Sequence, residues 1–251
     1  MSKTIIQSVV KAIAILKCFE NEKELGITEI SRKTVLNKST TFNMVTTLQL
    51  HGFLEQDADT LKYRLGMELY RIGMTVHVDL RKIVFPYLDE LVSAFKETVN
   101  FVLRDGADVV YMDKVESPHS MRISTGAGTR LPLYATAVGK AILSGLSAEE
   151  VSAILRGVSF AGYTNNTISN ETDLVQYIKQ AKEQGYAEDI EELEPGLICV
   201  AAPIFNFKGK AYAAISISGP TSRMNASVRA EMGSALVTVT QEISDKIGYK
   251  R

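Results

Sequence analysis

The sequence predicts an α+β protein in which a small helical domain with a β-hairpin precedes a larger domain built on an antiparallel sheet with flanking helices. Two stretches carry this prediction. Residues 26–66 have the pattern of a helix, a turn, a second helix and a short hairpin, which is the layout of a winged helix-turn-helix. From residue 98 onward, β-rich segments flank the turn sequences at 105–106 and 208–210, which are typical of antiparallel hairpins.

The composition limits the class of protein. A chain of 251 residues is long enough for two domains, and a net charge of -1 excludes a protein that is basic throughout. Cys18 and Cys199 follow no metal-ligand spacing, which favours reduced thiols. No apolar run approaches the ~20 residues of a membrane helix, and the N-terminus lacks a signal-peptide pattern. We therefore expect a cytoplasmic protein without a membrane partner, a metal or a cofactor.

The N-terminal domain is expected to span residues 5–66. Its first helix should cover residues 5–20, because apolar side chains recur there at helical spacing. Thr28 is expected to cap a second helix that begins near Glu29, with a turn at 36–37.

A third helix is expected from residue 38 to about 51, followed by a hairpin with strands at 53–55 and 63–65. One face of this helix should be apolar and buried, and the opposite face should present hydroxyl and amide side chains. The residues expected in the core are Phe42, Val45, Leu48 and Leu50, and those expected on the polar face are Ser39, Thr40, Thr41, Asn43 and Thr47.

Residues 67–80 are expected to form a linker helix, and residues 81–250 a second domain. The helices predicted in this domain cover 81–97 (with Pro86 in the first turns), 135–144, 171–184 and 226–247. The predicted strands cover 99–103, 109–112, 121–124, 197–205 and 211–218.

The stretch between Ile30 and Leu54 contains no Asp or Glu, so its surface would not repel a phosphate backbone. Short polar side chains on the third helix can reach base edges, and nearby basic side chains can pair with phosphates. The candidate base-reading residues are Ser39, Thr40, Thr41 and Asn43. The candidate phosphate-binding residues are Arg32, Lys33, Lys38, Lys62 and Arg64.

The same pattern has a second interpretation. Ser39 and the threonines can serve merely as a helix cap and a solvated face, and some winged helices bind proteins rather than DNA. Composition alone leaves both interpretations open.

Several sequence blocks fit one known family in order and spacing. They include LGITEI (25–30), LNKSTTF (36–42), GFL (52–54), YRLG (63–66), LPLYATAVGKA (131–141) and ISISGP (215–220), with further matches at 185–186, 191–192, 196–197, 199 and 201–204. On these blocks, which cover nearly the whole chain, the sequence resembles the IclR family of transcriptional regulators. Many members carry a basic residue where this chain has Asn43, so a base preference cannot be carried over.

The resemblance implies a ligand-responsive regulator, more often a repressor, that controls a small-molecule catabolic operon. It further implies binding to palindromic double-stranded operator DNA as a dimer or tetramer, and a GAF-like effector domain that holds a small organic acid. The pocket positions carried over by the resemblance are Ser120, Ile123, Ala137, Val138, Asp189, Glu191, Cys199, Ala201, Ser216 and Ser218.

Residue chemistry is compatible with such a pocket. Ser216 and Ser218 are two apart on a predicted strand and share a face, as do Cys199 and Ala201. Hydroxyls, a thiol and backbone N–H groups at the start of the 135–144 helix can bind a carboxylate, and Asp189 can accept a hydrogen bond from the ligand. The alternative is that the serines line a solvated strand face and that Cys199 is a small core residue.

Other motifs are weaker. Gly139-Lys140 lacks the remainder of a P-loop, residues 126–128 read as a loop, and the acidic run 188–194 reads as a solvated loop rather than a metal site. An alternative to the regulator is a small-acid sensor or a thiol-dependent enzyme whose winged helix contacts proteins. Its one candidate pair, Cys199 with His119, fits no known thiol-hydrolase signature, so the sequence does not favour an enzyme.

Overall fold

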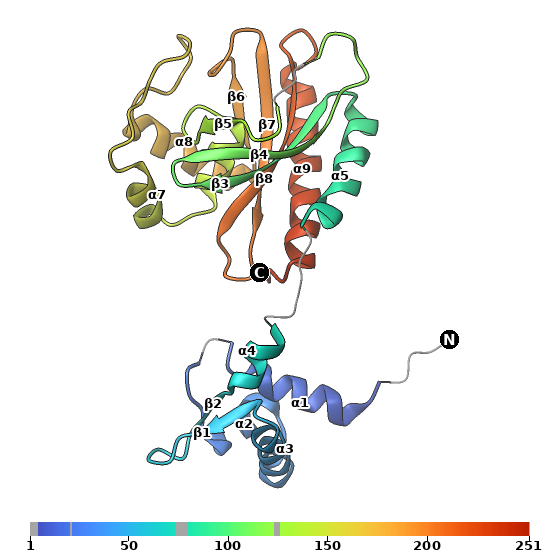
Figure 1. The fold of residues 1–251 in the computed structure, drawn as a ribbon, viewed down its shortest axis with the longest axis vertical. Coiled ribbons are helices and arrows are strands. Elements are labelled where there is room, and N and C mark those ends of the chain that lie inside the picture. The colour runs from blue at the N-terminus through green and yellow to red at the C-terminus, as the bar shows by residue number, and fades with distance from the viewer. Residues whose placement is uncertain (1–4, 21, 74–79, 123–125, 251) are drawn as a thin grey trace. The chain divides into compact units, whose positions relative to one another are not determined.

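In the computed structural model, which describes residues 5–20, 22–73, 80–122 and 126–250, the chain divides into two units. The N-terminal unit spans residues 1–78 and the C-terminal unit spans residues 79–251 (Figure 1). The class is α+β, as predicted, because a helical unit with one hairpin is followed by a sheet with helices on both faces. Within the described residues, no helix is both long enough and apolar enough to cross a membrane.

Three helices form the body of the N-terminal unit: α1 (Gln7–Lys17), α2 (Ile27–Thr34) and α3 (Lys38–Leu50). They enclose one apolar core together with the hairpin. The buried residues of this core are Ile15, Phe19, Leu25, Ile30, Val45, Leu54 and Tyr63. The first helix is shorter than the predicted 5–20, and the third agrees with its prediction to within one residue.

The start of α2 differs from the prediction. Gly26, rather than Thr28, is the N-cap residue, and its backbone N–H donates to the Glu29 carboxylate at 2.7 Å. A glutamate three residues after the cap can satisfy an otherwise unpaired N–H in this way. Thr28 therefore lies inside the first turn of the helix.

The buried stripe of α3 also differs from the prediction. Thr41 and Val45 are fully buried, whereas Phe42 is 53% exposed and Leu50 is 80% exposed. Positions four apart lie on the same side of a helix, and a neighbouring position is turned by about 100°. A stripe that passes through Thr41 and Val45 therefore leaves Phe42 outside the core.

The hairpin consists of β1 (Leu54–Gln56) and β2 (Tyr63–Leu65), which pair antiparallel. Its turn is held by the Asp57 carboxylate, which accepts from the backbone N–H groups of Asp59 at 3.1 Å and Thr60 at 2.8 Å. This turn stabilises the hairpin without an Asn-Gly pair. Helix α4 (Met67–Gly73) follows. Residues 74–79 of the predicted linker helix, 67–80, lie outside the described residues, and residue 80 is the first residue of the next helix.

The C-terminal unit contains one antiparallel sheet with the strand order β5-β4-β3-β8-β7-β6. Its strands are β3 (Thr98–Asp105), β4 (Asp108–Val115), β5 (Arg130–Pro132), β6 (Ala187–Ile190), β7 (Leu197–Phe205) and β8 (Ala211–Pro220). Its helices are α5 (Leu80–Phe95), α6 (Ala137–Ser144), α7 (Ala148–Leu155), α8 (Glu171–Gln184) and α9 (Ala226–Lys246).

Each face of the sheet is covered by helices. Helices α5 and α9 pack on one face of the sheet (Figure 1), together with Val99 and Phe101 of β3. Helix α6 packs on the other face, where Val102 points. Side chains alternate between the two faces along each strand. This alternation separates two cores, one on each side of the sheet.

Several predictions for the elements of this unit need correction. Met121 and Arg122 are not in a strand, and the rest of the expected strand at 121–124 lies outside the described residues; instead β5 pairs with β4. Helix α7, which the prediction omits, begins after the N-cap Ser147. The acidic run is not a solvated loop, because β6 occupies its first part and pairs with β7, which buries Asp189 (2% exposed).

Candidate functional site

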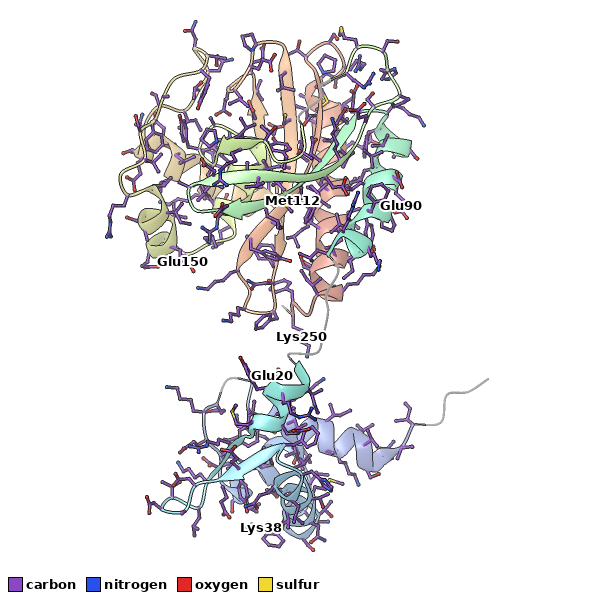
Figure 2. The ribbon with its side chains drawn as sticks, in the orientation of Figure 1. Glu20, Lys38, Glu90, Met112, Glu150 and Lys250 are labelled. Carbon is purple, nitrogen blue, oxygen red and sulfur yellow. The ribbon has the colours of Figure 1, made fainter. Side chains whose placement is uncertain are left out.

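The outer surface of α3 carries four of the nine side chains predicted to meet DNA. Lys38, Ser39 and Asn43 are exposed, and Thr40 is partly buried (Figure 2 labels Lys38). The helix is capped by Asn37, whose side chain accepts from the Thr40 backbone N–H at 2.8 Å. This cap fixes the first turn, from which the polar side chains project.

Thr41 does not lie on this surface. Its hydroxyl donates to the Asn37 carbonyl at 3.0 Å, and its side chain is fully buried in the core. A threonine tolerates this position because the carbonyl of the preceding turn satisfies its hydroxyl. The expectation that Thr41 reads bases is therefore incompatible with its position.

The predicted phosphate-binding residues are all exposed. Arg32 and Lys33 lie in the last turn of α2, and Lys62 and Arg64 lie on the hairpin. Two of these cations have carboxylate partners: Lys33 pairs with Glu22 at 2.9 Å and Arg64 pairs with Glu55 at 3.2 Å. Exposed pairs of this kind contribute about 0–1 kcal/mol, so a DNA phosphate can replace the carboxylate at little cost.

In the C-terminal unit, three predicted pocket residues lie side by side across three strands. Asp189 of β6 is opposite Cys199 of β7, and Cys199 is opposite Ser218 of β8. Two residues further along β7, Ala201 is opposite Ser216 of β8. These side chains share the face that α6 covers, which also buries the predicted residues Ala137 and Val138 of α6.

Asn100 of β3 joins this row although the sequence analysis did not single it out. Its Nδ2 donates to the hydroxyl of Ser218 at 3.2 Å and to the hydroxyl of Ser216 at 3.4 Å. Its Oδ1 is buried and has no hydrogen-bond partner among the described residues. The signal in the sequence is one amide within an otherwise apolar strand segment at 99–103.

A cavity of about 470 Å³ opens at this row. It is lined by Tyr111, Arg122, Gly126, Thr129, Leu131, Leu193, Glu194, Leu197, Cys199 and Ser218. Its size and its mixture of apolar and polar groups suit a small ligand. A separate hollow of about 380 Å³ beside α9 is lined by none of the predicted residues.

The other predicted pocket residues are placed differently. Ser120 is exposed and does not line the cavity, and Ile123 lies outside the described residues. Glu191 is half-buried, and its carboxylate accepts from the Gly196 backbone N–H at 2.7 Å, which closes the loop after β6. That loop forms part of the cavity wall through Leu193 and Glu194.

The start of α6 also differs from the prediction. The helix begins at Ala137 rather than Ala135, and Thr136 is its N-cap. The Thr136 hydroxyl accepts from the Gly139 backbone N–H at 3.1 Å, so this N–H is not available to a carboxylate.

Next to the row, two acidic side chains, Asp189 and Glu192, lie close to one buried cation, Lys140. Lys140 of α6 is fully buried, forms an ion pair with Glu192, and holds its ammonium 4.3 Å from the centre of the Tyr177 ring. The Glu192 backbone N–H donates to the Asp189 carboxylate at 2.7 Å. Lys140 therefore anchors the loop after β6 to the helix layer.

Burial controls the protonation of this region. Desolvation raises the pKa of Asp189 to about 6, although the hydrogen bond from Glu192 and the charge of Lys140 act in the opposite direction. Desolvation also raises the pKa of the Cys199 thiol. A thiol kept protonated is a poor nucleophile, which argues against the thiol-enzyme alternative.

The fold and these two surfaces define a class: a helix-turn-helix protein whose second domain has a cavity sized for a small ligand. Two family models match, the IclR helix-turn-helix domain over residues 8–58 and the bacterial transcriptional regulator IclR C-terminal domain over residues 72–245. The chain belongs to the IclR family of transcriptional regulators, and it is a regulator rather than an enzyme.

Similar proteins agree over nearly the full length. The chain is 38% identical to the HTH-type transcriptional regulator XynR of Escherichia coli over 248 residues, which are 98% of each protein. It is 36% identical to KdgR of E. coli over 97% of this chain and 94% of KdgR. The crystal structure of the Thermotoga maritima IclR matches with a TM-score of 0.66 and 32% identity, over 97% of this chain and 99% of that one.

Proposed function

We propose that this regulator is a repressor that binds operator DNA through α3. We further propose that its affinity for the operator changes when a small organic acid binds in the cavity at Cys199 and Ser218. The observation that carries the ligand assignment is the row of polar groups on one sheet face, from Asp189 to Asn100, whose middle members Cys199 and Ser218 line the cavity. A buried polar row next to a cavity is expected where polar ligand groups are bound.

The chemistry of the wall favours an acid that also carries a hydroxyl or oxo group. Arg122 supplies a cation at the wall, and its Nε–H donates to Glu116 at 2.8 Å. A ligand carboxylate can take over this pairing, because the Arg122 side chain is partly exposed. The Ser218 hydroxyl, which lines the same cavity, then offers a partner for a polar group of a short chain.

The apolar part of the ligand has its own wall. Leu131, Leu193 and Leu197 line the same cavity. This leaves room for a short carbon chain between the cation and the serine. A short-chain oxo or hydroxy acid meets all three requirements.

Self-association is supported by an exposed apolar stripe that begins at Ile6, the N-cap residue of α1, and continues along the helix. The described side chains of Ile6, Val9, Val10 and Ile13 are all exposed, and they recur at helical spacing. Helix α4 adds exposed Met67 and Tyr70. A second copy of the chain would cover such a stripe and would place two copies of α3 on an inverted repeat.

Repression is supported by relatives. The Transcriptional repressor IclR of E. coli is 32% identical over 98% of this chain and 92% of its own length. The HTH-type transcriptional repressor AllR of E. coli is likewise 32% identical, over 97% of this chain.

The test is a titration of the purified full-length protein against its own promoter region at two salt concentrations, with and without a panel of small organic acids. The proposal expects tight, salt-sensitive binding that one acid alters. Specific binding that no acid alters would contradict the ligand assignment, and the absence of any specific binding would contradict the whole proposal.

A further inference from the structure

Phe42 is an aromatic side chain of α3 that the core does not use. It is 53% exposed, and it is not among the residues of the core beneath the helix, which Thr41 and Val45 enter instead. About half of the Phe42 surface remains in contact with solvent in the folded unit. It is placed where another molecule can cover it.

The position of Phe42 on the helix is informative. Lys38 is four residues before it and Ser39 is three residues before it, so both are its neighbours on the helix surface. Asn43, the next residue, is also exposed. The ring therefore stands in the first half of α3, among the side chains that we propose meet DNA.

A phenyl ring can make one kind of base contact in the major groove. It has no hydrogen-bond donor or acceptor, and the apolar group on a base edge there is the thymine C5-methyl. We infer that Phe42 contacts a thymine methyl in each half-site of the operator and so determines sequence specificity at that position. This inference rests on the proposed placement of α3 in the major groove.

The size of the effect follows from the group removed. Burial of one methyl-sized apolar group corresponds to about a fourfold change in affinity. Removal of the methyl in both half-sites of a dimer's operator should then weaken binding about tenfold or more.

The experiment uses the full-length protein and a site selected by it from a random DNA duplex library. Each thymine of that site is replaced with deoxyuridine, symmetrically in both half-sites, and affinity is measured by fluorescence anisotropy. Low salt keeps weakened complexes measurable, since it strengthens phosphate contacts without affecting the comparison of methyl groups.

The inference expects one symmetric thymine pair whose replacement weakens wild-type binding about tenfold. In Phe42→Ala, the thymine and deoxyuridine sites should bind equally. In the matched control Leu50→Ala, which removes another exposed apolar side chain from the last turn of α3, the methyl effect should persist. Phe42→Leu, which keeps an apolar side chain, should retain part of the effect of the thymine methyl on affinity.

Three results would overturn the inference. One is a selected site in which no thymine responds to deoxyuridine, as expected if the ring packs on a deoxyribose. The second is a methyl effect of equal size in Phe42→Ala, which would assign the thymine to another side chain such as Thr40. The third is a failure to select any site, which would overturn the placement of α3 as well and so differs from the first two.

Discussion

The two surfaces that define this regulator are built in opposite ways. The α3 surface is exposed, and the two ion pairs recorded around it, Lys33–Glu22 and Arg64–Glu55, are open to solvent. The row beside the cavity is buried. Its polar groups, and the Lys140–Glu192 pair next to it, are linked by hydrogen bonds and an ion pair within the sheet and the helix layer. Changes on the first surface should therefore alter binding, whereas changes in the second should first alter stability.

The largest expected effect is at the buried Lys140–Glu192 ion pair next to the row. Lys140→Met leaves Glu192 buried without its partner, which should cost about 3–5 kcal/mol of unfolding free energy. Chemical denaturation, followed for the transition of the C-terminal unit, measures this loss. The matched exposed change is Lys33→Met, which should cost less than about 1 kcal/mol. An equal loss of unfolding free energy in the two variants would contradict the proposed difference between the surfaces.

Thr41 provides a test within α3 itself. Thr41→Asp places a carboxylate in the core and should destabilise the N-terminal unit by at least about 2 kcal/mol, measured by thermal unfolding. Ser39→Asp puts the same group on the exposed face, where it should weaken DNA binding and leave stability nearly unchanged. If Thr41→Asp remains fully stable and loses only DNA binding, the burial of Thr41 is contradicted.

Asp189 should make the unfolding free energy of the C-terminal unit depend on pH. Its pKa is raised from 3.8 to about 6, so the folded state holds the proton more tightly than the unfolded chain does. The loss of unfolding free energy caused by the charged, buried carboxylate is absent below about pH 4. It increases between about pH 4 and pH 6 and stays constant at higher pH.

Asp189→Asn removes this charge and keeps an oxygen for the Glu192 N–H. It should raise the unfolding free energy by about 2 kcal/mol at pH 8 and have little effect at pH 4. Denaturant titrations at both pH values measure the difference. A gain that is the same at both pH values would show that the charge of Asp189 is not its source.

The smallest expected effect is on the exposed surface. Lys33→Gln should weaken binding to all DNA sequences by less than about 1 kcal/mol and reduce the slope of log affinity against log salt by about one. Affinities measured over a salt series on operator and unrelated DNA test this. A loss confined to the operator would assign Lys33 a base contact.

The same contrast explains what the sequence could predict. On strands, side chains alternate with a period of two, so the shared face of Ser216 and Ser218 follows from spacing alone. On α3, apolar residues occur at 42, 44, 45, 48 and 50, which surround much of the helix, so the pattern does not define which side is buried. For this reason Thr41, which is expected to be exposed, is buried, and Phe42, which is expected to be buried, is exposed.

Long-range pairing accounts for the remaining differences. The strand β6 is acidic and short, and only its pairing with β7 reveals that Asp189 points into the protein. Asn100 is 116 residues from Ser216 in the chain, so no local pattern connects them. The cavity wall likewise combines Tyr111, Arg122 and Leu193 from three separate segments.

The most direct test of the central claim, that the cavity and the α3 surface are coupled, is operator affinity with and without the active acid in wild type and in Ser218→Leu. Binding at coupled sites is reciprocal, so wild-type operator affinity should change with the acid, and acid affinity should change with the operator by the same factor. Ser218→Leu should lower the stability of the C-terminal unit, because Ser218 is buried and accepts from Asn100. At a temperature where the variant remains folded, it should bind the operator as wild type does and lose the acid response. An unchanged acid response in this variant would contradict the account.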